Sequence, residues 1–150
     1  MKYIIIGIGQ FGRALARYLT YGGFEVTILD EREDVVRELA DSVSYALVGD
    51  DTDIRVLRQM EVQDSNVIVA IGEEFERSIL ITALLHDLGA KKIYVRSVSE
   101  LHARVLGKVG ATSLFRVEDV AAKQLAGLFI NEGLTALRRV DNTHSVAEVT

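Results

Sequence analysis

The sequence predicts a doubly wound α/β fold, in which helices cover both faces of one parallel sheet of six strands. Two continuous apolar runs, at residues 2–7 and 67–71, lack the alternation of a sheet with one exposed face, so they indicate strands buried on both sides. Segments with apolar residues at helical spacing separate such runs, and glycines stand between the segments. A chain of 150 residues is long enough for one domain with one core.

Strands and helices are expected to alternate along the chain. The expected strands cover residues 2–7, 25–30, 44–48, 66–71, 92–96 and 113–115. The expected helices between them cover residues 10–21, 32–40, 52–60, 75–88 and 99–108. Helical spacing is clearest through Phe11, Ala14, Leu15, Tyr18 and Leu19, through Val35, Val36 and Leu39, and through Ile79, Ala83, Leu84 and Leu88. Glycines that suit helix ends and turns with positive φ are Gly22, Gly23, Gly49, Gly72, Gly89 and Gly110.

A last helix over 117–131 is expected to carry more apolar surface than it needs to cover its own domain. Its apolar residues include Val117, Val120, Ala121, Leu125, Leu128 and Phe129. An exposed apolar patch usually marks an interface, so we expect contact with another subunit; the alternative is a helix folded back on its own sheet. Residues 145–149 suit a short strand. We therefore expect a domain over 1–131, and over 132–150 the start of a missing or truncated C-terminal lobe.

Composition and charge argue against several classes of function. The net charge of −5 gives no electrostatic footprint for nucleic acid. Because the chain has no cysteine, a disulfide, a thiolate nucleophile and a zinc–thiolate cluster are excluded. No segment approaches the roughly 20 apolar residues that cross a bilayer, and the N-terminus shows no secretory leader, so we expect a cytosolic protein.

A glycine-rich motif directly follows the first expected strand and opens the first expected helix. The motif is Gly7-Ile-Gly9-Gln-Phe-Gly12, which has the spacing and the context of the dinucleotide fingerprint. Gly7 permits the turn, Gly9 lets a pyrophosphate approach the backbone, and Gly12 lets the helix pack closely on the strand. We interpret the motif as a nucleotide site rather than as a glycine turn without a ligand.

Asp30 ends the second expected strand, where an acidic side chain accepts hydrogen bonds from the adenosine ribose. A carboxylate there would repel a 2′-phosphate, which disfavours NADP. Two alternatives remain open for these positions. Asp30 can also cap the following helix, and Arg32 can stack on adenine, neutralise Asp30 or belong to a solvated helix start.

Other residues are expected at the same edge of the sheet. The run Gly49-Asp-Asp-Thr-Asp53 follows the third strand, beside the adenine end of such a ligand. Its acids border the adenine, or Asp51 or Thr52 caps the next helix; the two alternatives are equally favoured. A carboxylate metal site there is the weaker hypothesis. Gly72 follows the fourth strand at the switch point of the sheet, which favours close backbone approach to a ligand. Arg96 ends the fifth strand and contacts a phosphate or pairs with Glu100.

Evidence for catalysis is thin. No tyrosine is followed by lysine four positions later, and no phosphate loop of the GxxxxGK[ST] type is present. His86 and His102 lie on expected helices among apolar residues, which favours packing over acid–base chemistry, and His144 lies in the tail. A hydride-transfer enzyme also needs a second domain over its nicotinamide, and the first domain takes nearly all of this chain.

The order of the motifs is itself recognisable: GIGQFGRALARYL, LDERED, VGDDTD, VIVAIG and VRSVSELHARVLGKVGAT. Over residues 1–130 the sequence resembles the TrkA-N, or KTN, family, the Rossmann-like N-terminal domain of regulators of K⁺ conductance. The resemblance implies a regulatory cytosolic domain without turnover. It implies a domain that dimerises, assembles in rings under a potassium-translocating membrane protein and binds NAD(H), ATP, ADP or AMP.

The resemblance also implies roles for individual residues. Around the phosphates it places Gly7, Gly9, Gln10, Phe11 and Gly12. It places Asp30 and Arg32 at the adenosine ribose and base, Asp50, Asp51 and Thr52 at the adenine edge, and Ala70, Ile71, Gly72 and Arg96 on the far side. ATP-preferring members often carry arginine at the position of Gln10. Members often have Pro-Glu where Val117-Glu118 stands, and in some relatives that glutamate helps to hold a divalent ion, although charge at a helix start explains Glu118 equally well.

The alternative function is a small NAD-dependent oxidoreductase fragment that has lost its substrate domain. A redox sensor that acts on a transcription factor would need a cysteine or a DNA-binding segment, and the sequence has neither.

Overall fold

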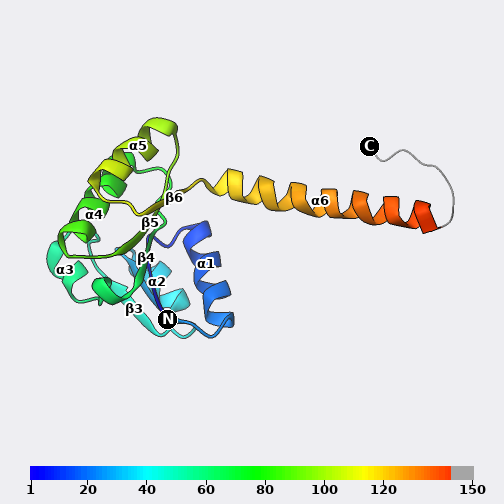
Figure 1. Ribbon diagram of the computed structural model, residues 1–150. Helices are drawn as coiled ribbons and strands as arrows, with labels where there is room; N and C mark the ends of the chain where they lie inside the picture. Colours follow the sequence, from blue (N-terminus) through cyan, green and yellow to red (C-terminus); the bar gives the residue numbers. More distant parts are fainter. Residues whose placement is uncertain (143–150) are drawn as a thin grey trace. The chain divides into compact units, whose positions relative to one another are not determined.

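One six-stranded sheet forms the centre of the computed structural model, which describes residues 1–142 (Figure 1). Its strands are β1 (Lys2–Ile6), β2 (Glu25–Asp30), β3 (Tyr45–Val48), β4 (Asn66–Val69), β5 (Lys92–Arg96) and β6 (Ser113–Phe115). All neighbouring pairs are parallel, in the order β3-β2-β1-β4-β5-β6. The chain therefore adopts the predicted doubly wound fold, with its switch point between β1 and β4.

Helices cover both faces of the sheet (Figure 1). The covering helices are α1 (Gln10–Tyr21), α2 (Glu33–Leu39), α3 (Ile54–Arg58), α4 (Phe75–Asp87) and α5 (Glu100–Val109), with a 3₁₀ turn at Val62–Asp64. A further helix, α6 (Val117–Asn142), follows the last strand in the chain. Helices α1 and α2 pack on one face through Ala16, Val35 and Leu39. Helices α3, α4 and α5 pack on the other through Leu57, Ile81, Leu85 and Leu106.

The central strands show why the sequence runs looked uniformly apolar. All four residues of β4 are buried, and Ile4, Ile5 and Ile6 of β1 are at most 2% exposed. Alternate residues of β1 enter the two separate cores, since Ile4 and Ile6 face the α4 side and Ile5 faces the α1 side. A strand covered on both faces is mostly apolar, and the polar residue of β4, Asn66, lies at its first position.

The helix expected over 52–60 is shorter than predicted. It covers Ile54–Arg58, because the Asp53 side chain accepts the Arg55 N–H and so caps the helix at that residue. The alternative in which Asp51 or Thr52 caps this helix is therefore wrong.

The last helix is longer than predicted, because α6 runs without interruption from Val117 to Asn142. The predicted end at residue 131 is wrong, because Ile130, Leu134 and Leu137 continue the helical spacing past Gly133. A glycine inside a helix costs about 1 kcal/mol, which does not end a helix that is otherwise favourable. The expected strand at 145–149 lies outside the described residues.

The chain divides into two compact units, Met1–Arg116 and the segment that begins at Val117. The first unit holds the complete sheet. The expected domain over 1–131 and tail over 132–150 stay a prediction. In the described part of the chain, no helix combines the length and the apolar character that a bilayer crossing requires.

Candidate functional site

The ends of β1, β2 and β4 meet at the carboxyl edge of the sheet, where the glycine motif begins. The Gly7 N–H donates to the Leu29 carbonyl at 3.0 Å, and the Ala70 N–H donates to the Ile6 carbonyl at 2.8 Å. The turn after β1 is thus fixed between its two neighbouring strands. Ligands of open α/β sheets bind at this switch point.

Three glycines shape the turn, each in a different way. Gly7 has φ of +92°, a conformation that side chains rarely allow. A Cβ atom on Gly12 would lie 2.3 Å from the Gly7 carbonyl oxygen, so only glycine lets α1 start this close to β1. A Cβ on Gly9 would meet no atom within 4 Å, so the backbone at Gly9 borders open space.

The first turn of α1 is free to receive an anion. Gly9 is its N-cap, no side chain caps the helix, and no acidic residue lies in the first turn. Gln10 is exposed beside it. Unpaired N–H groups and the helix dipole together favour a negatively charged group at such a terminus.

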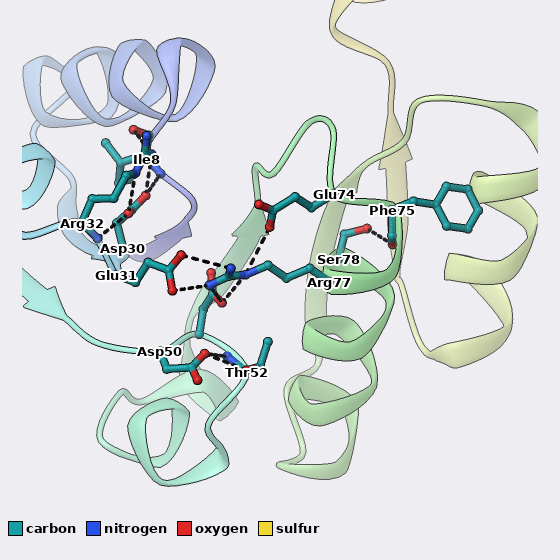
Figure 2. A network of polar contacts seen from close by, with 11 residues as sticks. Ile8, Asp30, Glu31, Arg32, Asp50, Thr52, Glu74, Phe75, Arg77 and Ser78 are labelled. Carbon is teal, nitrogen blue, oxygen red and sulfur yellow. Dashed lines mark hydrogen bonds and ion pairs between the residues drawn. The ribbon is translucent and has the colours of Figure 1, made fainter.

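Asp30 lies buried beside this turn and accepts hydrogen bonds on both oxygens (Figure 2). Its Oδ2 accepts the Ile8 N–H at 2.8 Å, and its Oδ1 accepts the Arg32 N–H at 2.9 Å. The Arg32 guanidinium adds bonds of 3.0 Å to each oxygen, and it also donates to the Ile8 carbonyl. Burial opposes ionisation of Asp30, but the bonds from Arg32 and Ile8 outweigh it, so the pKa of Asp30 is lowered.

Of the alternatives for these two residues, the structure contains the ion pair. Arg32 neutralises Asp30, and the N-cap of α2 is Arg32 itself, without a side-chain bond. Asp30 therefore does not cap α2. The Arg32 side chain remains half exposed, at 54%, and can leave the carboxylate without crossing the core.

The loop after β3 turns its acids in different directions. Asp50 accepts the N–H and the hydroxyl of Thr52 on its Oδ1, which holds the loop and lowers the pKa of Asp50. Asp51 points inward, with only 5% of its side chain exposed. Burial raises the pKa of Asp51, and Arg77 offsets part of that effect.

Arg77, in the first turn of α4, is a residue of this edge that the sequence did not single out. Its guanidinium contacts Asp51 at 2.6 Å, Glu31 at 3.1 Å and Glu74 at 3.4 Å (Figure 2). It thereby connects the ends of β2 and β3 to α4. In the sequence Arg77 belongs to a charged run that is typical of a solvated helix start, so no local signal distinguished it.

The far side of the edge consists of the β4–α4 turn and Arg96. Ala70 is buried, and Ile71 is half-buried against Gly7. A Cβ on Gly72 would lie 2.8 Å from a guanidinium nitrogen of Arg96, so Gly72 provides space rather than a positive φ. The Arg96 guanidinium carbon lies 6.0 Å from the centre of the Phe11 ring, which packs on Phe115.

His102 takes no part in this edge. It is fully buried, its Nδ1 accepts the Val98 N–H at 3.1 Å, and its Nε2 lies 2.7 Å from the Ser78 hydroxyl oxygen. Its ring stacks on Phe75. The packing role predicted for His102 is confirmed, and burial lowers its pKa.

Comparison with known proteins agrees with this geometry. A family model described as the TrkA-N domain matches residues 3–117. The chain belongs to the TrkA-N family. The predicted resemblance is therefore confirmed over most of the first unit.

Named relatives of this TrkA-N protein belong to potassium uptake systems. Ktr system potassium uptake protein C of Bacillus subtilis is 35% identical over 149 residues, which are 99% of this chain and 67% of that protein. Ktr system potassium uptake protein A of Vibrio alginolyticus is 34% identical over 118 residues, which are 78% of this chain and 54% of that protein. The chain thus spans about two thirds of the first relative and about half of the second.

Solved structures share the TrkA-N fold. The NAD(P)-binding domain of an exopolyphosphatase-related protein from Archaeoglobus fulgidus is 26% identical, with a TM-score of 0.76 over 87% of this chain and 97% of that one. The Shewanella denitrificans Kef CTD in AMP bound form is 25% identical, with a TM-score of 0.67 over 93% and 81%. The GsuK channel bound to NAD, at 19% identity and a TM-score of 0.65 over 75% and 21%, supports the fold alone.

Proposed function

We propose that the protein is a regulatory domain or subunit of a potassium uptake system, which binds an adenine nucleotide and controls a membrane transporter by a change of conformation. The observation that carries the proposal is the open, uncapped start of α1 beside buried Asp30 at the switch point. The ligand is NAD(H) or one of ATP, ADP and AMP. The AMP-bound Kef domain and the potassium uptake relatives support both halves of the proposal.

The proposed site assigns one part of the nucleotide to each group of residues. The phosphates lie over the residues of the glycine turn: Gly7, Gly9, Gln10, Phe11 and Gly12. The ribose and base lie near Asp30 and Arg32, with Asp50, Asp51 and Thr52 at the adenine edge. The opposite wall is formed by Ala70, Ile71, Gly72 and Arg96. The fit rests on the N–H groups at the start of α1, which can donate to a phosphate, and on the Asp30 carboxylate, which can accept a hydrogen bond from a ribose hydroxyl.

Regulation is favoured over catalysis. Among the described residues, the Ser78–His102 contact is the one hydrogen bond between a serine and a histidine side chain, and both side chains are buried. The described residues also include no group of three acidic or histidine side chains placed to hold a metal ion. The competing function, an NAD-dependent oxidoreductase fragment, predicts turnover of NADH with a substrate.

Nucleotide binding is tested by melting the protein with NADH, NAD⁺, AMP, ADP and ATP at saturating concentrations. A ligand at about 100 times its Kd adds roughly 2.7 kcal/mol to the free energy of unfolding. For a chain of this size the midpoint then rises by roughly 5–10 °C. If no nucleotide moves the midpoint, the proposed site does not bind one. Mass spectrometry of the natively purified protein identifies any nucleotide that it retains.

Gly9→Ala separates binding from stability. The added methyl group enters open space, and Gly9 has φ of −85°, so the free energy of unfolding should stay unchanged. The same methyl group would occupy the place of the phosphates, so the nucleotide-induced rise in melting temperature should fall by more than half. Gly107→Ala, which also enters open space but lies on α5, is the matched control. If the nucleotide raises the melting temperature equally in Gly9→Ala and Gly107→Ala, the phosphates do not lie over Gly9.

Assembly and membrane partnership complete the proposal. Large apolar side chains of α6 are exposed, among them Leu125, Leu128 and Phe129. We infer a homo-oligomer, a dimer that can extend to a ring, which contacts an integral membrane potassium transporter at the cytoplasmic face. Potassium uptake in a bacterial strain deficient in its own uptake regulator tests the partnership. The wild type should restore uptake at low potassium, and Gly9→Ala should not.

A further inference from the structure

A hollow lies on the face of the sheet that α3 covers, at the opposite edge from the glycine turn. Its volume is about 350 Å³, and its lining includes Lys2, Glu25 and Tyr45, the first residues of β1, β2 and β3. The hollow arises because α3 is short. Its five residues rise by about 7.5 Å, whereas the six residues of β2 span roughly 20 Å. The helix therefore leaves the amino-terminal halves of these strands uncovered.

The floor of the hollow is apolar and consists of Ile4, Leu47 and Met60. Ile4 and Met60 are core residues that are 2% and 7% exposed, and Leu47 packs against the same core. A volume of about 350 Å³ lies at the lower end of the range for small-molecule sites, about 300–1,000 Å³. The floor can therefore bury the apolar body of a compact ligand.

Three polar side chains of the hollow make no hydrogen bond to the described residues. They are the Glu25 carboxylate, the Thr27 hydroxyl and the Gln59 amide. The register of the strands places Thr27 between Ile4 and Tyr45, so its hydroxyl lies at the centre of the lining. All three groups have an oxygen that can accept a hydrogen bond from a ligand N–H.

The charge at the rim of the hollow favours a cation. Lys2 forms an ion pair with Glu61, and Glu25 and Asp64 also act on its ammonium group. The pKa of Lys2 is raised by its hydrogen bond to Glu61 and by the negative charges of Glu61, Glu25 and Asp64. Three carboxylates thus surround one ammonium group, and the excess negative charge repels a phosphate and attracts a positively charged ligand.

We propose that this hollow binds a small organic ammonium ion at the Glu25 carboxylate, with the apolar body of the ligand against the floor. Lys2 already occupies Glu61, so Glu25 is the carboxylate whose hydrogen-bonding capacity remains available. The Tyr45 side chain, 62% exposed at the rim, adds an aromatic ring to which a cation is attracted. The inference does not rest on the proposed function, because the glycine turn and Asp30 lie at the carboxyl ends of the same strands.

Methyl NMR of the full chain tests the site, because Ile4, Leu47 and Met60 carry the methyl groups of the floor. The probes are butylammonium, cyclohexylammonium and phenethylammonium, each titrated at constant ionic strength to about 20 mM, which covers a Kd on the order of 1 mM. At least one probe should shift these signals along a saturating curve. Phenethyl alcohol and hydrocinnamate, which have similar bodies without the positive charge, should bind at least about 10-fold more weakly than phenethylammonium. If no ammonium probe shifts the floor, or if the alcohol or the acid binds equally well, the inference is wrong.

Glu25→Gln tests the carboxylate, because it removes the charge and keeps the size of the side chain. The Kd of the ammonium probe should rise about 10-fold, and the weaker binding of phenethyl alcohol should not change. Glu76→Gln removes the same charge from an exposed position in the first turn of α4 and should leave the affinity unchanged. An ammonium probe that binds Glu25→Gln as tightly as the wild type would overturn the inference.

Thr27→Leu tests the location by filling the hollow. The larger side chain should abolish the saturable shifts of the floor methyl groups, and shifts that persist in the folded variant would contradict the proposed location. Circular dichroism and melting report whether the variant folds, and the wild-type titrations with Glu25→Gln decide the inference if it does not. The nucleotide-induced rise in melting temperature should persist in Glu25→Gln, so failure of this site and failure of the nucleotide site are distinguishable.

Discussion

At the scale of the residue, Asp30 was predicted to accept hydrogen bonds from a ligand, and in the structure it accepts them from neighbouring residues of the chain. Both of its oxygens accept bonds from Ile8 and Arg32. A ribose hydroxyl must therefore displace the Arg32 guanidinium, which is half exposed, while the two backbone N–H bonds remain. The exchange replaces one donor by another and keeps the buried carboxylate paired, so its cost is small compared with that of stripping Asp30 of partners.

Asp30→Ala should weaken NAD binding and narrow the difference between NAD and NADP. The carboxylate accepts hydrogen bonds from the ribose hydroxyls of NAD and repels the 2′-phosphate of NADP. Its removal therefore weakens NAD binding and removes the repulsion of NADP. The change should also lower the free energy of unfolding by about 1–3 kcal/mol, because the Ile8 N–H loses its acceptor. Calorimetry with both cofactors measures the affinities. Asp34→Ala, at an exposed position in α2, is the control, and equal NAD and NADP affinity in the wild type would contradict the argument.

His102 should make the stability of the protein sensitive to mild acid. The Ser78 hydroxyl donates to the Phe75 carbonyl, so His102 Nε2–H donates to Ser78, and Nδ1 is the acceptor for Val98. The folded protein therefore requires the neutral ring, and the pKa is lowered from 6.5 by burial. As pH falls below 6.5, the unfolded chain binds a proton that the folded chain does not, so the free energy of unfolding decreases until pH passes the folded pKa.

Urea unfolding from neutral pH to about pH 5 measures this loss. His102→Asn keeps an acceptor near Val98 and cannot be protonated, so its stability, although lower at neutral pH, should depend less on pH. His86→Asn, at an exposed position on α4, should keep the slope of the wild type. Identical slopes in wild type and His102→Asn would show that His102 is not the group responsible.

At the scale of the element, the β1–α1 unit was predictable because each signal in it is local. The apolar run gives a buried strand, and the glycine spacing gives the turn, the close helix start and the open N-terminus. The parallel, doubly wound sheet also followed from the alternation of strands and helices. None of these features depends on a distant residue.

Gly12→Ala should destabilise this unit by about 1–3 kcal/mol, the range for overpacking. Its Cβ would lie 2.3 Å from the Gly7 carbonyl oxygen, and both atoms belong to backbone that the strand and the helix hold in place. The midpoint of thermal unfolding should fall by roughly 2–4 °C for each kcal/mol. Gly107→Ala, in open space on α5, should be neutral or slightly stabilising. An unchanged midpoint in Gly12→Ala would mean that α1 can move away from β1 at no cost.

The features that the sequence did not reveal depend on partners far along the chain. Asp51 looked like a helix cap, and its burial depends on Arg77, which lies 26 residues later. The cap of α3 belongs to Asp53, since Asp51 is already engaged. The predicted end of the last helix at residue 131 differs from the structure for a different reason, because Gly133 does not interrupt the apolar spacing that continues past it in α6.

At the scale of the whole molecule, the second unit carries exposed large apolar side chains along α6. On α6, Ala121, Leu125, Leu128 and Phe129 recur at the spacing of one helical face, and Leu125 and Phe129 are 51% and 60% exposed. Such a stripe on a helix is covered in a stable protein by another surface. A second copy of the same helix offers a self-complementary partner, since a two-fold dimer pairs identical patches.

Leu125→Glu with Phe129→Glu should therefore convert the protein to a monomer. The pair places two charges on the centre of the stripe, where the dimer would bury them without partners. Light scattering at tens of micromolar measures the mass of wild type and variant. Gln124→Glu with Asn131→Glu adds the same charge to α6 at polar positions and should preserve the oligomer. A monomeric wild type would contradict the assembly proposal, whereas a charged pair that leaves the oligomer intact would place the interface on another surface.

Because a ligand shifts an equilibrium only by its different affinities for two states, nucleotide should change the oligomer or its shape in the wild type alone.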